Sequence, residues 1–140
     1  MPKVLISDSL AEQGVAVLEQ ASGIEVINRP GASPDELLEL IPEIDGLAIR
    51  SATKVTPDVL AAAKNLRIVG RAGIGVDNID IASATEHGVV VVNTPEGNNI
   101  TTAEHAIALM VSLARHIPQA TASMKAVSYT HLRAHETRPY

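Results

Sequence analysis

The chain has 140 residues, a formal net charge of −5 and a hydrophobic content of 46%. This length suits one domain, or one domain with the start of a second, and the hydrophobic content argues against intrinsic disorder. The acidic balance gives no reason to expect a nucleic acid or an anionic membrane as partner, and a chain without cysteine has no disulfides. The N-terminus shows no signal-peptide pattern, so we expect a cytoplasmic protein.

Short aliphatic segments alternate with helical patterns over the first 93 residues. A serine before Pro34 and a threonine before Pro57 are typical helix N-caps, each followed by a good first helical residue. Because the strand segments are aliphatic throughout, we expect helices on both faces of a parallel sheet. Five strands favour an α/β fold with a flavodoxin-like doubly wound parallel sheet. The predicted strands are residues 4–6, 24–27, 46–49, 68–69 and 89–92, and the predicted helices are residues 10–20, 34–40, 59–63 and 79–86.

The sequence changes character after this unit. Residues 94–100 are rich in turn-forming residues. Thr101, with Glu104 three residues later, matches the capping-box pattern and predicts the start of a long helix. We expect this helix to run to about residue 117, because Pro118 follows there.

Two arginines follow neighbouring strands of the predicted sheet. Arg50 and Ser51 come after the third strand, and Arg71 comes after the fourth. Ligands of parallel sheets bind beyond the carboxyl ends of the strands. Two guanidinium groups and a hydroxyl at one edge suit a carboxylate or a phosphate, because arginine donates paired, charge-assisted hydrogen bonds. The alternative is that both arginines are solvated surface charges that pair with nearby acids.

Three glycines lie within residues 70–75, directly after the fourth strand. Glycine lets the backbone approach a ligand and point its N–H groups at an anion, so Gly73 and Gly75 are candidate binding residues. The spacing does not match a dinucleotide fingerprint, because Asn78 stands at the third glycine position and the next strand ends in Asn93 instead of an acid. A tight turn without a ligand is the other interpretation.

No acid–base pair or metal site is evident elsewhere. Glu104 is explained by helix capping, and His105 has the helical spacing of a packing residue without an acid placed to orient it. The serines lack the sequence context of a nucleophile, and no metal-ligand spacing occurs. A phospho-receiver would need acids where this chain has Arg50 and a lysine where it has Asn93.

Four stretches of the chain together resemble the D-isomer-specific 2-hydroxyacid dehydrogenases; they are residues 48–56, 69–80, 93–98 and 115–125. The resemblance extends from residue 2 to about residue 126 and implies an NAD-dependent oxidoreductase. The resemblance implies 3-phosphoglycerate as the substrate, oxidised to 3-phosphohydroxypyruvate in L-serine biosynthesis. The paired arginines favour such a phosphorylated substrate over a bare acid. A member acting on glyoxylate or hydroxypyruvate is the alternative within the family, and a non-catalytic flavodoxin-like binding module is the alternative outside it.

The resemblance also implies a division of the chain. Residues 1–98 would form the substrate-binding domain, and residues 99–126 the linker and first helix of a truncated NAD-binding Rossmann domain. Residues 127–140 depart from the family pattern, and we expect them to be foreign or disordered. The catalytic arginine, glutamate and histidine of the family have no counterpart here, so the resemblance implies that this chain alone is inactive.

Site residues follow from the same resemblance. Ile74 and Thr102 would lie beside NAD, whose main binding site would be missing from this chain. The resemblance implies no metal and a homo-oligomer for the full-length enzyme, in which an apolar helix face around Leu113 would be covered. The residues that it places at the substrate are Arg50, Ser51, Arg71, Gly73, Gly75 and Asn98.

Overall fold

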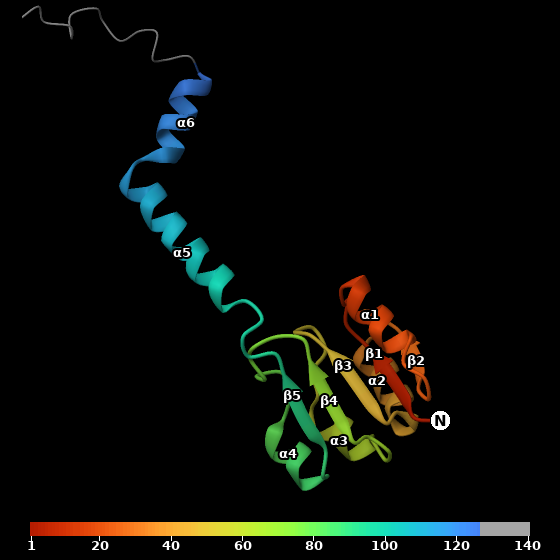
Figure 1. The fold of residues 1–140 in the computed structure, drawn as a ribbon. Coiled ribbons are helices and arrows are strands. Elements are labelled where there is room, and N and C mark those ends of the chain that lie inside the picture. The colour runs from red at the N-terminus through yellow and green to blue at the C-terminus, as the bar shows by residue number, and fades with distance from the viewer. Residues whose placement is uncertain (127–140) are drawn as a thin grey trace, which may run out of the picture. The chain divides into compact units, whose positions relative to one another are not determined.

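The structure, a computed structural model, describes residues 1–126 and has two compact units, Met1–Gly97 and a second that begins at Asn98. Residues 127–140, for which we predicted no structured element, lie outside the described residues. Figure 1 shows the order of the helices and strands. In chain order they are β1 (Lys3–Ile6), α1 (Glu12–Glu19), β2 (Glu25–Asn28), α2 (Pro34–Leu40), the short 3-10 helix η1 (Ile41–Glu43), β3 (Gly46–Ile49), α3 (Pro57–Ala62), β4 (Ile68–Arg71), α4 (Ile81–Glu86), β5 (Val90–Asn93), α5 (Asn99–Ala114) and α6 (Ile117–Lys125).

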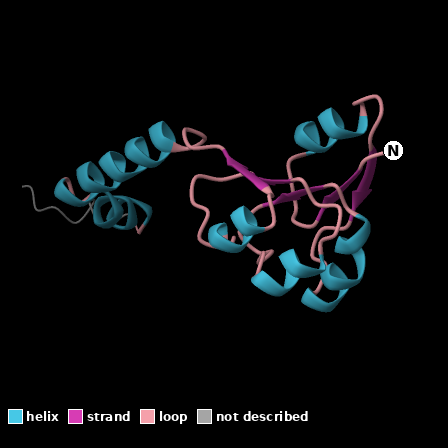
Figure 2. Ribbon diagram, turned by 90° about the horizontal axis from the view of Figure 1, so that it is seen from below, coloured by secondary structure: helices cyan, strands magenta, loops and turns pink. Residues whose placement is uncertain are grey.

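The first unit contains one sheet of five parallel strands in the order β2-β1-β3-β4-β5. The chain first adds β2 on one side of β1 and then builds β3, β4 and β5 on the other side. This order confirms the flavodoxin-like arrangement predicted from the sequence. Figure 2 shows α1 on one face of the sheet and α2, α3 and α4 on the other.

The helix starts follow the predicted capping residues. Ser33 accepts the N–H of Glu36 at 3.2 Å, and the Glu36 side chain accepts the N–H of Ser33 at 2.7 Å. Thr56 accepts the N–H of Val59 at 3.4 Å at the start of α3. Such caps satisfy N–H groups that have no partner within the helix, and each contributes about 1 kcal/mol. They fix where α2 and α3 leave the loops at the carboxyl edge of the sheet.

An aliphatic core fills the space between the sheet and α2–α4. The chain has no Phe or Trp, so this core consists of Leu, Ile, Val and Ala side chains. Burying one large aliphatic side chain contributes about 1.5–3 kcal/mol, so this layer supplies most of the stability of the unit. The buried members are Leu5, Leu37, Ile41, Ile44, Leu47, Ile49, Val55, Val59, Leu60, Ala63, Leu66, Val69, Ile79, Ala84 and Val89.

The opposite face of β4 and β5 is not covered by other residues of the first unit, Met1–Gly97. Ile68, Val90 and Val92 are 43%, 57% and 45% exposed. On the same face Ile6 of β1, close to α1, is fully buried. The expectation that helices cover both faces therefore holds at β1 but is wrong for β4 and β5 within the first unit, Met1–Gly97.

The second unit starts differently from the prediction. α5 begins one residue after Asn98, whose side chain makes no capping hydrogen bond. The capping box predicted at Thr101 and Glu104 is therefore wrong, because both residues lie inside the helix. His105, expected to pack, is exposed.

A second helix follows where the sequence predicted an end. α5 stops at Ala114, and His116 adopts the left-handed conformation with φ 52°. Pro118 lies in the first turn of α6, where its missing N–H leaves no hydrogen bond unmade. The proline was interpreted as a terminator, whereas in the structure it begins a new helix.

α5 carries several exposed apolar side chains, among them Leu113, around which the sequence analysis placed an apolar face. Five of them have exposed fractions between 52% and 71%. These residues are Ile107, Leu109, Met110, Val111 and Leu113. Among residues 1–126, no helix has both the length and the hydrophobicity that a membrane crossing requires.

Candidate functional site

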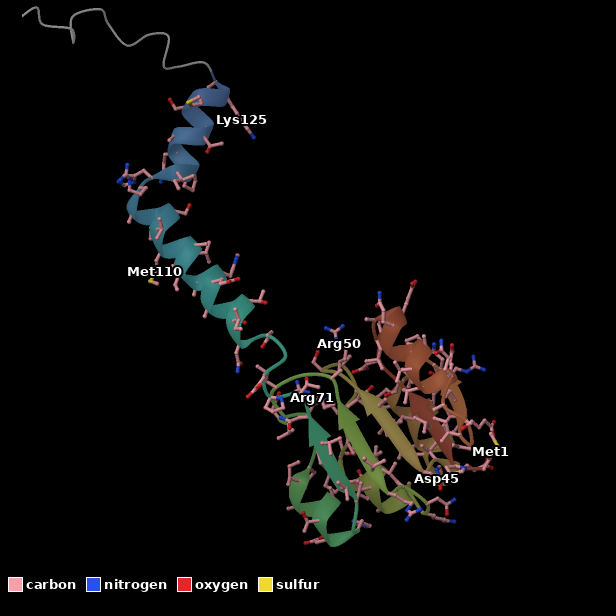
Figure 3. All side chains as sticks on the ribbon, viewed as in Figure 1. Met1, Asp45, Arg50, Arg71, Met110 and Lys125 are labelled. Carbon is pink, nitrogen blue, oxygen red and sulfur yellow. The ribbon has the colours of Figure 1, made fainter. Side chains whose placement is uncertain are left out.

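The loops that follow β1, β3 and β4 meet at the carboxyl edge of the sheet. Figure 3 labels Arg50 and Arg71 at this edge and Asp45 at the opposite one. The edge is organised by a side chain that the sequence analysis did not select. Asp8, two residues after β1, is only 4% exposed and points its carboxylate into the loop after β3.

The Asp8 carboxylate accepts hydrogen bonds from the turn at residues 50–53. Oδ2 accepts the backbone N–H groups of Arg50 at 2.6 Å and Ala52 at 3.2 Å. The N–H of Thr53 reaches both oxygens, at 3.1 and 3.2 Å, and its hydroxyl donates to Oδ1 at 2.6 Å. Three converging N–H groups and a hydroxyl form an anion-binding nest, and here a carboxylate of the chain itself occupies it.

The electrostatics of Asp8 reflect this geometry. Burial raises the pKa of the carboxyl group, because it disfavours the charged form. The hydrogen bonds from the Thr53 hydroxyl and from the N–H groups of Arg50, Thr53 and Ala52 together outweigh burial and hold the pKa below 3.8. Asp8 is therefore an anion at neutral pH.

Arg50 and Ser51 face outward from this turn. Both are exposed, and the Arg50 guanidinium makes one long hydrogen bond, from Nη1 to the carbonyl of Ser9 at 3.3 Å. They border a shallow hollow of about 430 Å³ together with Asp8, Pro30 and Gly31. The exposed Arg50 side chain thus lies beside a hollow at the edge where the sequence analysis expects an anion.

Arg71 is held much more tightly. It is the last residue of β4, which runs two residues beyond the predicted strand. Its side chain is 10% exposed; Nε donates to the carbonyl of Arg50 at 3.2 Å, and Nη1 lies 3.3 Å from Oδ1 of Asp77. Nη1 is buried and, among residues 1–126, makes no hydrogen bond in addition to that ion pair. The alternative interpretation of Arg71 thus holds in part: the arginine pairs with a nearby acid, Asp77, but its side chain is not a solvated surface group.

The glycine loop folds over the Arg71 guanidinium. A Cβ at Gly75 would lie 2.7 Å from Oδ1 of Asp77 and 2.8 Å from Nη1 of Arg71, and one at Gly73 would lie 3.7 Å from Cζ of Arg71. Neither glycine has a positive φ, so close approach is the reason for glycine here. Within residues 1–126, the N–H groups of Ile74, Gly75 and Val76 have no hydrogen-bond partner.

Asn78 ties the loops after β3 and β4 together. Its Nδ2 donates to the carbonyls of Arg50 at 2.8 Å and Thr53 at 2.6 Å. The sequence analysis noted Asn78 only because it breaks the dinucleotide fingerprint. A conformational role was not visible, because the signal is a pair of contacts to residues 25 and 28 positions earlier in the chain.

The structure thus brings five of the predicted substrate residues to one edge of the first unit, namely Arg50, Ser51, Arg71, Gly73 and Gly75. Ile74 lies in the same loop, with a 41% exposed side chain. Asn98 and Thr102 belong to the second unit, where Asn98 is the N-cap of α5. Residues 1–126 contain no cluster of His, Asp and Glu side chains that would hold a metal ion.

Comparison with known proteins places the chain in a family. Residues 4–136 match the profile of the catalytic domain of the D-isomer specific 2-hydroxyacid dehydrogenases. The chain belongs to this family. The match includes residues 127–136, which lie beyond the described part of the chain.

Relatives within the family are similar over most of this chain. The D-3-phosphoglycerate dehydrogenase of Synechocystis is 51% identical over 125 residues, which are 89% of this chain and 22% of that protein. The enzyme of the same name from Archaeoglobus fulgidus is 51% identical over 123 residues, or 88% of this chain and 23% of that protein. This chain therefore spans about a fifth of the length of these curated relatives.

A solved family member has a similar fold. The NAD⁺-bound 3-phosphoglycerate dehydrogenase of Entamoeba histolytica is 31% identical and has a TM-score of 0.68. The similarity covers 79% of this chain and 38% of that one.

Proposed function

We propose that this chain is the substrate-binding part of an NAD-dependent D-3-phosphoglycerate dehydrogenase, which oxidises 3-phosphoglycerate to 3-phosphohydroxypyruvate for L-serine synthesis. The observation that carries the proposal is the carboxyl edge of the sheet. There a free guanidinium, an oriented one and unpaired N–H groups of the glycine loop lie on neighbouring loops. The similarity to enzymes of that name at 51% identity supports the choice of substrate.

Each group has a distinct task in this proposal. Arg50 and Ser51 bind the phosphate or carboxylate from the side of β3, since both are exposed and a guanidinium donates charge-assisted hydrogen bonds to such anions. Arg71 supplies fixed positive charge beneath the glycine loop. The N–H groups of Gly75 and its neighbours donate to a substrate oxygen. Asn98 is a further proposed substrate-binding residue.

NAD supplies the hydride acceptor when it is bound. No dinucleotide fingerprint occurs in residues 1–126, so the main NAD site does not fit these residues and would be provided by the rest of a longer protein. Ile74 fits a peripheral contact, because its exposed side chain stands on the glycine loop. Thr102, in α5, is the second residue proposed to contact NAD. Residues 1–98 then act as the substrate domain and residues 99–126 as the start of the nucleotide domain.

A chimera tests this function. Residues 1–125 replace the matching part of the Synechocystis relative, and NAD-dependent oxidation of 3-phosphoglycerate is measured. Arg50→Ala and Arg71→Ala each remove charge-assisted hydrogen bonds and should weaken substrate binding by about 1.5–3 kcal/mol, seen as a higher KM with NAD affinity unchanged. Arginine-to-lysine changes should restore only part of the loss, since an ammonium group does not make the paired contact.

Arg67→Ala is the matched control, because Arg67 is exposed and precedes β4 at the opposite edge. It should change substrate kinetics by no more than about 0.5 kcal/mol. The assignment of this edge is wrong if Arg50→Ala and Arg71→Ala both behave like the control. Turnover of glyoxylate or hydroxypyruvate in preference to the phosphorylated pair would favour the alternative within the family.

A further inference from the structure

The nest at residues 50–53 is already occupied by the Asp8 carboxylate, so other groups must bind the substrate anion. Its N–H groups point inward to Asp8, so they are not available to a ligand. A ligand anion would have to displace a carboxylate that is 4% exposed and bound by four donors. Anion binding at this turn is therefore left to the side chains of Arg50 and Ser51.

The peptide groups of Arg50 connect Asp8 to the rest of the edge. The N–H of Arg50 is held by Asp8 at 2.6 Å. The carbonyl of the same residue accepts from Nε of Arg71 at 3.2 Å and from Nδ2 of Asn78 at 2.8 Å. A shift of the Arg50 backbone would therefore move the acceptor that orients Arg71.

The fixed orientation of Arg71 depends on few contacts. Nε donates the hydrogen bond to the carbonyl of Arg50, whereas among residues 1–126 Nη1 has only the 3.3 Å ion pair with the exposed Asp77. A guanidinium binds a carboxylate or phosphate through paired donors that lie in one plane. The strength of that binding therefore depends on how firmly the orientation of the guanidinium plane is fixed. The carbonyl of Arg50 is the contact that holds it.

We infer that Asp8 is a positioning residue of the anion site: its carboxylate fixes the turn at residues 50–53 and, through the carbonyl of Arg50, sets the plane of the Arg71 guanidinium. This inference rests on the proposed function for the identity of the anion. The linkage from Asp8 to Arg71 is a property of the chain itself and does not depend on the substrate.

Asp8→Asn tests the linkage with little change in side-chain volume. The amide of asparagine keeps one acceptor oxygen but places an NH₂ group against the N–H donors of the turn. The turn at residues 50–53 therefore loses some of the hydrogen bonds that fix it. Asp45→Asn is the matched control, because Oδ2 of Asp45 accepts the backbone N–H of Lys3 at 2.8 Å at the opposite edge. Both variants lose a carboxylate that accepts a backbone N–H. Only Asp8 is connected to Arg71, through the backbone of Arg50.

The first measurement is ¹H–¹⁵N NMR of the 140-residue chain. Asp8→Asn should shift the Nε–H signal of Arg71 and speed its exchange with water by about tenfold or more, together with the amides of Arg50 and Thr53. Asp45→Asn should leave the Arg71 signal in place. An unchanged Arg71 signal in folded Asp8→Asn overturns the inference, whatever the protein acts on.

The second measurement uses the active chimera. Asp8→Asn should raise the KM for 3-phosphoglycerate by roughly tenfold more than Asp45→Asn does, with a smaller change in kcat and none in NAD affinity. Equal KM values in the two variants would show that Asp8 contributes to stability alone, and would overturn the inference. A wild-type chimera without 3-phosphoglycerate turnover counts against the proposed function, and the NMR result then decides the linkage alone.

Discussion

The hydroxyl of Thr53 donates to Oδ1 of Asp8 at 2.6 Å, and the two residues are 45 positions apart in the chain. The hydroxyl of Ser7 lies 2.9 Å from the same Thr53 oxygen. All three residues are buried, with exposed fractions of 1% for Ser7, 4% for Asp8 and 9% for Thr53. Hydrogen bonds to a buried charge are among the strongest in a protein. The hydrogen bonds among Ser7, Asp8 and Thr53 therefore join the residues after β1 firmly to the turn after β3.

Thr53→Val should destabilise the protein. The change keeps the shape of the side chain but removes the hydroxyl that donates to Asp8, so we expect a loss of about 1.5–3 kcal/mol in the free energy of unfolding. Urea unfolding at neutral pH measures it. Thr85→Val is the control, because the Thr85 hydroxyl donates to the carbonyl of Ile81 at 2.8 Å on an exposed helix, and the loss there should stay within about 0.5 kcal/mol. Equal losses would show that the buried charge adds nothing.

The stability of the protein should fall at acid pH partly because of Asp8. Its folded-state pKa lies below 3.8, so the ionised carboxylate contributes stability that is fully present above the unfolded-state value. That contribution is lost as the pH falls through the folded-state pKa. Hydrogen bonding to the Ser33 backbone lowers the pKa of Glu36, and a hydrogen bond from Lys3 lowers that of Glu43, so both act in the same direction.

Asp8→Asn isolates the Asp8 part of this acid dependence. The difference in unfolding free energy between wild type and variant should be constant from about pH 5 to 7 and should shrink below pH 3.8. Urea titrations at several pH values give this difference directly. A gap that stays undiminished at about pH 2.5 would mean that the charge of Asp8 does not stabilise the fold.

Gly75→Ala should disturb the Arg71 guanidinium. The new Cβ would lie 2.7 Å from Oδ1 of Asp77 and 2.8 Å from Nη1 of Arg71, so at least one of these side chains must move. We expect a higher KM for 3-phosphoglycerate in the chimera and a loss of about 1–3 kcal/mol in stability from overpacking. Gly14→Ala in α1 meets no atom within 4 Å and should instead stabilise by about 0.5–1 kcal/mol. A Gly75→Ala protein as active as wild type would show that Asp77 swings away without cost.

The 140-residue chain should self-associate through α5. Leu113 is 71% exposed and Met110 is 63% exposed, and an apolar surface of this kind favours a second copy as its cover. Sedimentation velocity over a range of concentrations should show oligomers, and Leu113→Glu should reduce them. Gln119→Glu adds the same charge to a polar position of α6 and should change nothing. A chain that stays monomeric at high concentration would rule out this prediction.

The isolated chain should not oxidise 3-phosphoglycerate. The groups at its carboxyl edge bind and orient anions, and residues 1–126 contain no dinucleotide fingerprint to hold NAD. An assay with NAD and purified chain should give no rate above the blank, whereas the chimera should be active. Turnover by the chain alone would contradict the proposal that this chain binds substrate while the rest of a longer protein binds NAD.

The strands and helix starts of the first unit were predictable because they depend on local composition. Aliphatic segments such as 46–49 and N-cap residues such as Ser33 determine strands and helix starts within a few positions of sequence. The break between α5 and α6 was not predictable in the same way. Pro118 is compatible with the end of one helix and with the first turn of another, and the left-handed residue His116 that decides between them leaves no clear mark in the sequence.

The candidate site was predictable at the level of residue type and strand end. Arg50, Ser51 and Arg71 follow from their places after β3 and β4. Asp8 also follows a strand, but its function depends on a turn more than 40 residues away, and periodicity carries no information on such a contact. The difference between a free Arg50 and a held Arg71 likewise arises from packing, because Gly75 closes over only one of them.

The position of β1 in the sheet constrains the order in which the protein can fold during its synthesis. β1 is synthesised before the other strands of this sheet, yet it pairs with β2 on one side and with β3 on the other. Residues 3–6 therefore stay half paired until residues 46–48 have been made, and Asp8 stays in water until the turn at residues 50–53 exists. Long-range pairing of this kind slows folding and exposes strand edges to wrong partners. In a nascent chain that stalls before residue 53, the edge of β1 that normally pairs with β3 would be exposed. Such a chain would be a substrate for chaperones.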